Sequence, residues 1–270
     1  MIKDITLGQY FPGDSAVHRL DPRTKIVLTT AYMVALFCSF NAVTLALSCL
    51  FMVLVTLISR VPLRLIVKGV KPILPILLLT AVFNAFYMDG RVIWRFYFVT
   101  LTYEGIQTAV FISVRLVFLI IGTSMMTYTT SPIAISDGLE QLMAPLKVIK
   151  IPVHELSMMM SIALRFIPTL IEETDKIMNA QKARGADFES GSILQRIRAL
   201  LPILVPLFVS AFRRAEELAL AMDCRCYRGG EGRTRLKRLK LSSVDYISSA
   251  VFAMLFAAVI LLNIFIPAWL

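Results

Sequence analysis

Charged residues are scarce in this 270-residue sequence: they make up 17% of it, while 57% is hydrophobic. Soluble domains average about 25% charged and about 45–50% apolar residues. With a mean hydropathy of +0.75, the chain has too little polar surface to cover a core in water, which excludes a soluble protein and also a disordered one. Four cysteines are too few for a disulfide-stabilised scaffold. An integral membrane protein with a net charge of +10 remains.

Residue groups that carry out catalysis are missing as well. The sequence has no Gly-x-x-x-x-Gly-Lys-Ser/Thr loop to hold a nucleotide phosphate. Its two histidines, His18 and His154, stand far apart, and no paired acids in the apolar runs mark an ion path. A membrane enzyme would need clustered His, Asp or Glu near the interface. We therefore expect no catalytic residue, no cofactor and no bound metal, and we expect any ATP hydrolysis to occur in other chains.

Long uncharged runs predict membrane-spanning helices. The run from Ile26 to Ser59 is too long for one crossing of a hydrocarbon core about 30 Å thick, so a helical hairpin turning near 39–41 is expected. The predicted spans are 24–40, 42–59, 72–88, 105–130 and 246–270. Apolar runs at 156–164 and 199–212 are shorter than about 18 residues, which favours five spans. Seven spans is the alternative. Met1–Leu20 is charged and has no long apolar region, so no cleavable signal is expected.

Lysine and arginine residues indicate the orientation in the membrane. They precede the first predicted span, occupy the acid-free linker 60–71 and precede the last span between 225 and 240. Because cytoplasmic loops carry an excess of such residues, we expect the N-terminus and the segment 131–242 to be cytoplasmic and the C-terminus to be outside. The basic run 228–240 is interpreted as an anchor near anionic lipid rather than as a nucleic-acid site.

The segment 131–242 shows helical periodicity and is not a linker. Ser136 is expected to cap a short helix, a second helix should run from Pro152 to about Arg184, and a third should cover about 192–226. Both long helices are apolar in their first half and charged in their second half, so each would link the bilayer to a cytosolic partner. Three regions follow: a membrane bundle (1–130), a cytoplasmic coupling-helix region (131–242) and a C-terminal transmembrane helix (243–270).

The two long helices end in similar sequences, 41 residues apart. The first end reads Ala180-Gln181-Lys182-Ala183-Arg184-Gly185 and the second reads Ala221-Met222-Asp223-Cys224-Arg225-Cys226. Small residues beside the arginine allow close approach to a groove, and the guanidinium offers planar donors to a carboxylate. The preference of cations for helix C-termini would explain one such end, but the repetition favours docking. Gly185 suits the left-handed residue that ends a helix. Cys226 suits it less well, so Gly229 and Gly230 are an alternative end.

Further motifs follow one another along the chain: His-Arg-Leu-Asp-Pro-Arg-Thr-Lys at 18–25, Lys-Pro-Ile-Leu-Pro at 71–75, Thr-Thr-Ser-Pro at 129–132, Pro-Val-His-Glu-Leu at 152–156 and Leu-Arg-Phe-Ile-Pro-Thr-Leu at 164–170. With the two helix ends, they make nearly the whole chain resemble the transmembrane T-component of energy-coupling factor transporters, the CbiQ family. The resemblance implies an all-α integral membrane protein of the bacterial or archaeal cell (inner) membrane, with about five transmembrane helices and long amphipathic coupling helices.

The resemblance also implies partners and a role. Such a protein couples two cytosolic ABC ATPase subunits to a small membrane substrate-binding (S) component, for uptake of a vitamin or a metal ion. A conventional ABC-importer permease, which forms the solute path itself, is the alternative. It would ordinarily carry one coupling helix per subunit, whereas two unlike helix ends in one chain favour engagement of two ATPases.

Docking residues follow from the resemblance and from the apolar pattern. In the family, each motif arginine docks in a groove of one ATPase, which implies docking through Ala183, Arg184 and Gly185 at one end and Cys224, Arg225 and Cys226 at the other. The second end departs from the family, where Ala and Gly are usual in place of the two cysteines. The apolar halves of the long helices offer more apolar side chains than two helices can bury against each other. We expect S-component docking there, at Met159, Met160, Leu204 and Phe208.

Three features have two interpretations each. Cys224 and Cys226 would be a metal or redox site, but two thiols without a further ligand pair make a poor one. Arg115, inside a predicted span, is either functional or bound to a backbone carbonyl, a polar group of the bundle or water. The run Met158–Met160 is either core or a surface able to repack against several partners.

Overall fold

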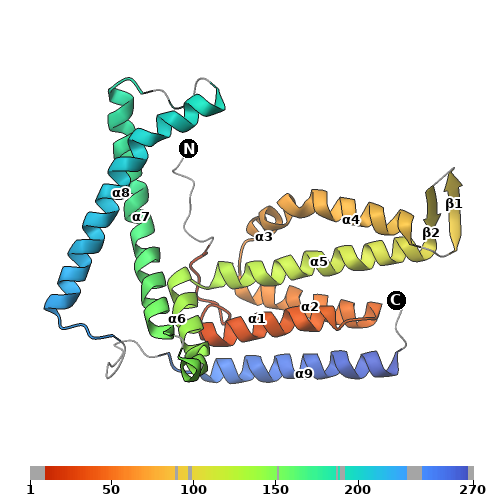
Figure 1. The fold of residues 1–270 in the computed structure, drawn as a ribbon. Coiled ribbons are helices and arrows are strands. Elements are labelled where there is room, and N and C mark those ends of the chain that lie inside the picture. Colours follow the sequence, from red (N-terminus) through yellow and green to blue (C-terminus); the bar gives the residue numbers. More distant parts are fainter. Residues whose placement is uncertain are drawn as a thin grey trace. The chain divides into compact units, whose positions relative to one another are not determined.

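The computed structural model describes residues 10–88, 91–96, 99–150, 152–186, 188, 192–229 and 239–266. These residues are mostly helical (Figure 1). The helices are α1 Pro22–Phe37, α2 Ala42–Ser59, α3 Leu63–Val70, α4 Leu74–Tyr87, α5 Tyr103–Thr129, α6 Pro132–Leu142, α7 Val153–Ala183, α8 Ile193–Cys224 and α9 Ser243–Phe265, with 3-10 turns η1 Lys71–Ile73 and η2 Ala144–Ile149. The helical fold class is confirmed, with one exception. A short antiparallel hairpin of β1 Val92–Phe96 and β2 Val99–Thr102 precedes α5.

The chain forms two compact units. The described residues of Gly8–Leu142 and Arg238–Leu270 form the bundle unit, which contains α1–α6 and α9. The described residues of Met143–Lys237 form the two-helix unit, which contains α7 and α8. The division of the sequence at 131 and 242 into regions of different role stays a prediction.

Four helical segments are long and apolar enough to cross a membrane: Ala42–Ser59, Leu63–Tyr87, Tyr103–Thr129 and Ser243–Phe265. They correspond to four of the predicted spans. The remaining predicted span is α1, whose 16 residues extend about 24 Å, less than a hydrocarbon core of about 30 Å. It nevertheless packs against α2, α5 and α9. In the part of the chain that the structure describes, α7 and α8 are not among the segments that meet this criterion.

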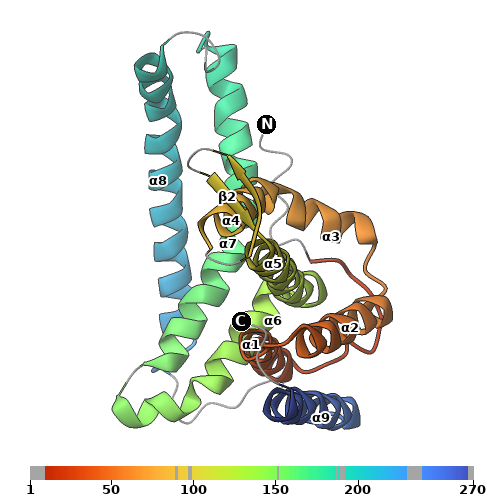
Figure 2. The ribbon, with the colours of Figure 1, turned by 90° about the vertical axis from the view of Figure 1, so that its right-hand side faces the viewer.

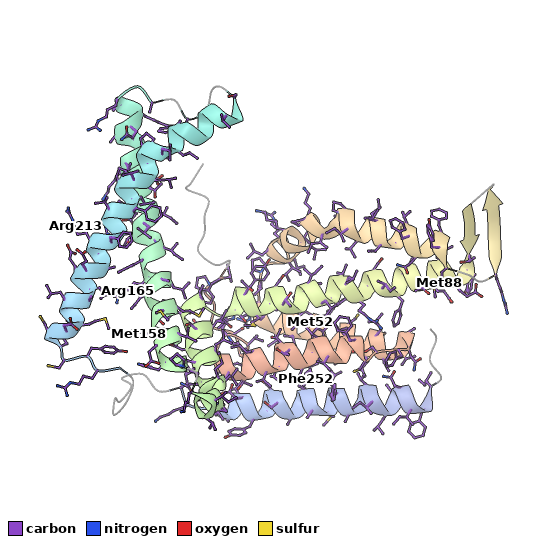
Figure 3. The ribbon with its side chains drawn as sticks, in the orientation of Figure 1. Met52, Met88, Met158, Arg165, Arg213 and Phe252 are labelled. Carbon is purple, nitrogen blue, oxygen red and sulfur yellow. The ribbon has the colours of Figure 1, made fainter. Side chains whose placement is uncertain are left out.

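The core of the bundle unit lies between α1, α2, α5 and α9 (Figure 2). Tyr32 and Leu36 of α1 meet Met52 of α2, Met125 of α5 and Phe252 of α9 in one buried cluster (Figure 3). Helices in membranes associate through close packing, which small residues permit. Gly122 of α5 is such a residue, because an added Cβ would lie 2.9 Å from the Tyr32 ring.

Polar contacts join three helices at one end of the bundle. The buried ammonium of Lys25 donates three hydrogen bonds. The acceptors are the carbonyl of Thr129 (2.8 Å), the hydroxyl of Thr130 (3.1 Å) and the carbonyl of His18 (3.1 Å). The Asp245 carboxylate accepts from the backbone N–H of Asp21 at 2.8 Å. The start of α1, the end of α5 and the start of α9 are thereby held together. The motif at 18–25 thus has a structural role within the bundle.

The structure favours the structural interpretation of Arg115 over the functional one. Its guanidinium donates to the Ser39 carbonyl in the turn between α1 and α2 and lies 4.7 Å from the centre of the Phe111 ring. Beside it, Asn263 of α9 donates to the Cys38 carbonyl at 2.5 Å. A contact from Arg115 to a backbone carbonyl is therefore confirmed, and it fixes the turn of the predicted helical hairpin.

Two further local elements of the bundle unit differ from the sequence prediction. Helix α6 begins at Pro132, and the Ser131 hydroxyl accepts from the Ala134 N–H at 3.3 Å. The prediction that Ser136 caps this helix was wrong, because proline suits the first helical turn and the serine before it supplies the cap. Ser136 is buried inside the helix. The basic linker at 60–71 also contains α3, a short helix not predicted from the sequence.

Candidate docking site

The two-helix unit consists mainly of α7 and α8, which pack against each other and run in opposite directions (Figure 1). With 31 and 32 residues, each extends about 45–50 Å. The predicted bounds, Pro152 to about Arg184 and about 192–226, agree with these helices to within two residues. Pro152 stands at the N-cap of α7, where its missing N–H costs nothing.

Side chains of the charged halves connect the two helices. The Glu173 carboxylate accepts a hydrogen bond from the Ser210 hydroxyl and another, at 2.8 Å, from the Arg214 guanidinium. The Ser210 hydrogen bond, more than the nearby guanidinium, lowers the pKa of Glu173 from its usual value. Glu173 and Arg214 are 41 residues apart, the same spacing as the two similar helix ends. The pair was not predicted, although that spacing was its signal in the sequence.

The end of α7 has a defined backbone geometry. The N–H of Gly185 donates to the carbonyl of Lys182, and the N–H of Ala186 donates to that of Gln181, both at 3.0 Å. Gly185 has a φ of +86°. This pair of bonds around a left-handed residue is a Schellman motif, with Arg184 as the last residue before the left-handed position. The prediction that Gly185 ends the helix in this way is confirmed.

The end of α8 repeats that geometry. The N–H of Cys226 donates to the carbonyl of Asp223 at 2.9 Å, and the N–H of Tyr227 donates to that of Met222 at 3.1 Å. Cys226 takes the left-handed position, with a φ of +53°. The alternative end at Gly229 was wrong, because these two bonds offset the strain of a left-handed non-glycine residue, about 1–2 kcal/mol. Gly230 lies outside the described residues.

Both helix ends present their side chains to solvent. Ala183, Arg184, Cys224 and Arg225 are exposed. Within the described residues, neither arginine makes a side-chain hydrogen bond or an ion pair. Around Gly185, no heavy atom of the described residues, apart from its two chain neighbours, lies within 4 Å of the position that a Cβ would take. The guanidinium groups of Arg184 and Arg225 therefore follow the same backbone conformation and, among the described residues, remain available to a partner.

The thiols at the second helix end are free. Cys224 and Cys226 are both exposed and form no disulfide. Among the described residues, no group of three or more His, Cys, Asp or Glu side chains is arranged to hold a metal ion. Nothing in the described geometry therefore singles out the two thiols as a metal site.

The apolar halves of α7 and α8 are exposed at the residues predicted to dock a membrane partner. Met159, Met160, Leu204 and Phe208 are 54%, 50%, 44% and 62% exposed. Other exposed apolar residues accompany them: Leu156, Leu200, Leu201, Val205, Val209 and Phe212. Met158 is half-buried on α7, about two helical turns before Arg165 (Figure 3). Apolar surface of this extent marks a contact with protein or membrane.

Comparison with known proteins supplies the family. A model of the CbiQ family, described as cobalt transport protein, matches residues 13–236. A protein of Thermosediminibacter oceani is 54% identical over 90% of this chain and 92% of its own length, and one of Clostridium kluyveri is 55% identical over 92% and 93%. A protein of Bacillus subtilis is 48% identical over 97% and 98%. All three are named energy-coupling factor transporter transmembrane protein EcfT.

Proposed function

The chain belongs to the CbiQ family of transmembrane components of energy-coupling factor transporters, and we propose that it couples two cytosolic ATPase subunits to a substrate-binding membrane subunit. In this proposal the chain itself catalyses nothing. ATP is hydrolysed in the partner chains, and their motion passes through α7 and α8 to the membrane. The cargo of such a complex is a vitamin or a metal ion.

The observation that carries the proposal is the pair of matched helix ends. Two exposed arginines, Arg184 and Arg225, stand at the same place in two Schellman motifs. A guanidinium in this position offers two parallel donors to a carboxylate at the bottom of a groove, and the small neighbours Ala183 and Gly185 allow the helix end to enter it. Two such ends in one chain fit two ATPase subunits.

The second element of the proposal is the exposed apolar surface on each long helix, at Met159 and Met160 of α7 and at Leu204 and Phe208 of α8. Because the two helices run in opposite directions, these two patches lie on opposite sides of the Glu173–Arg214 contact (Figure 1). Burial of one exposed side chain of this size is worth roughly 1.5–3 kcal/mol against water, and less against lipid. We assign both patches to the small substrate-binding membrane subunit. Methionine side chains repack readily, which suits a surface that receives more than one partner.

The third element is orientation. The polar end of the bundle, where Lys25, Thr129 and Asp245 meet, adjoins the basic residues of the N-terminal motif and of the 60–71 segment. Because basic residues stay on the cytoplasmic side, we assign this end, the N-terminus and α7 with α8 to the cytoplasm. The chain is then a multi-pass protein whose docking arginines face the cytosolic ATPases.

Co-purification in mild detergent tests the proposal. Tagged chain should retain two ATPase subunits and one small membrane protein. Arg184→Ala and Arg225→Ala should each weaken ATPase association at least about thirty-fold, because an unpaired charge left in an interface costs about 2 kcal/mol or more. Arg184→Lys should rescue only in part, since an ammonium does not make the bidentate contact.

Arg213→Ala is the matched control, because Arg213 is an exposed arginine of α8 away from either helix end (Figure 3). It should leave association unchanged. Membrane insertion of every variant is checked by fractionation. Normal ATPase association in the Arg184→Ala/Arg225→Ala double variant would refute docking through these arginines. Recovery of a second copy of the chain, with no separate substrate-binding subunit, would favour a conventional permease.

A further inference from the structure

Helix α3 has a fixed position at one end of the bundle unit. It follows directly after α2 and lies across the direction of α5, which Figure 2 shows end-on. Its inner face is pinned, since Ile66 is 7% exposed and the Tyr128 hydroxyl donates to the Leu65 carbonyl at 3.0 Å. Gly69 permits this approach, because a Cβ there would lie 2.9 Å from the Tyr128 oxygen. The helix is thus a built element rather than a loose linker.

Four cations stand on the outer side of this segment. Arg64, Lys68 and Lys71 follow the i, i+4, i+7 spacing that places side chains on one helix face, and Arg60 immediately precedes the helix. All four are exposed. None makes an ion pair within the described part of the chain, and the sequence from 22 to 88 contains no acid. Within the described residues, no carboxylate compensates the positive charge of this face.

Apolar side chains accompany the cations. Leu63 and Val67, four residues apart on neighbouring positions of the helix, are 66% and 65% exposed. The segment continues through η1 into α4, and α3, η1 and α4 together form Leu63–Tyr87, a stretch long and apolar enough to cross a membrane. A helix that carries a basic stripe beside an exposed apolar stripe, at the end of a membrane helix, is arranged for the boundary between lipid headgroups and acyl chains.

We propose that α3 binds anionic phospholipid headgroups through Arg60, Arg64, Lys68 and Lys71, with Leu63 and Val67 inserted into the acyl boundary. Phosphate oxygens accept from the planar guanidinium fork and from ammonium groups, so the lipid supplies the missing negative charge. An acidic protein surface would pair with the cations but would leave the two apolar side chains in water. A lipid surface pairs with the cations through its phosphates and buries the two apolar side chains among its acyl chains. Because α3 leads through η1 into α4, the segment already lies next to a predicted membrane helix.

Native mass spectrometry of the purified full-length chain tests this. The chain is titrated with phosphatidylglycerol and with phosphatidylcholine of the same acyl composition. Wild type should bind the anionic lipid more tightly. The triple variant Arg64→Gln/Lys68→Gln/Lys71→Gln should lose about a hundred-fold in affinity for phosphatidylglycerol, since each surface cation is worth about five-fold and the three factors multiply. Its affinity for phosphatidylcholine should stay the same.

Two further variants control the experiment. Arg91→Gln/Lys176→Gln/Arg213→Gln removes three exposed cations elsewhere and the same total charge, and it should keep the preference for phosphatidylglycerol. Arg64→Lys should also keep the preference for phosphatidylglycerol. Leu63→Ser/Val67→Ser should lower the affinity for both lipids. Equal losses in the two triple variants would overturn the proposal. So would an α3 triple variant that keeps its lipid preference but loses a co-expressed protein partner, since that would assign the stripe to a protein.

Discussion

Glu173 of α7 pairs with Arg214 of α8, and each stands 11 residues before the arginine that ends its own helix. The spacing between Glu173 and Arg214 is 41 residues, which is also the spacing between Arg184 and Arg225. In the repeat, the two paired residues therefore occupy equivalent positions. Arg184 and Arg225 each lie about 16 Å along their helices from this contact. Because the helices run in opposite directions, the ion pair lies midway between the two helix ends that carry Arg184 and Arg225.

Charge reversal at this contact should loosen the helix pair. Glu173→Arg places two guanidinium groups together, and amide protons of α7 and α8 near the contact should then exchange faster with deuterated solvent. Glu173→Arg/Arg214→Glu should restore protection, with a coupling energy of about 0.5–1 kcal/mol for a partly exposed pair. Glu172→Arg, at the exposed neighbouring position, should change little. A swapped variant no better protected than the single variant would show that the pair does not hold the helices.

The two helix ends should respond oppositely to exchange of their left-handed residues. Gly185→Ala should destabilise its helix end by about 1 kcal/mol, and this cost is backbone strain alone because the surrounding space is open. Cys226→Gly removes such strain and should leave ATPase co-purification intact, with a helix end at least as well protected against hydrogen exchange. Loss of assembly in Cys226→Gly would instead assign a role to the thiol.

The apolar halves of the long helices should be needed for the membrane partner rather than for the ATPases. Met159→Asp or Leu204→Asp puts a carboxylate on the exposed apolar surface, where binding would leave it unpaired. Each should reduce recovery of the substrate-binding subunit more than that of the ATPases in the same pull-down. Loss of the ATPases with retention of the membrane subunit would mean that the two halves have the opposite assignment.

The buried lysine of the N-terminal motif should be structural. Lys25→Met removes an ammonium that serves three oxygens at 2.8–3.1 Å and leaves those oxygens without their donor. The free energy of unfolding in detergent should fall by about 2–4 kcal/mol. Lys68→Met, at an exposed lysine with no ion pair in the described residues, should change stability by less than about 0.5 kcal/mol. Equal melting temperatures for the two variants would contradict the contacts described for Lys25.

Several elements were predictable because their signals are local in sequence. Long apolar runs, uncharged for α2 and α9 and interrupted only by Arg115 for α5, identify these helices, since a bilayer admits only long segments with satisfied backbones. The ends of α7 and α8 were located to within two residues, because Pro152 and Gly185 restrict the backbone on their own. Short elements with weak local signals were not predicted. The hairpin at 92–102 and the eight-residue α3 have no long apolar run of their own that would indicate them.

By itself, the sequence determined that the chain is a helical membrane protein, that its long helices end in repeated arginines, and which family it resembles, because composition, periodicity and motif order are properties of the chain alone. Only the tertiary structure decided that Lys25 reaches Thr129, that Arg115 reaches Ser39 and that Glu173 meets Arg214. These pairs are separated by 41 to 104 residues, so they depend on how helices pack. It also decided that Cys226 adopts the left-handed conformation, since two backbone hydrogen bonds outweigh the preference that a cysteine has in isolation.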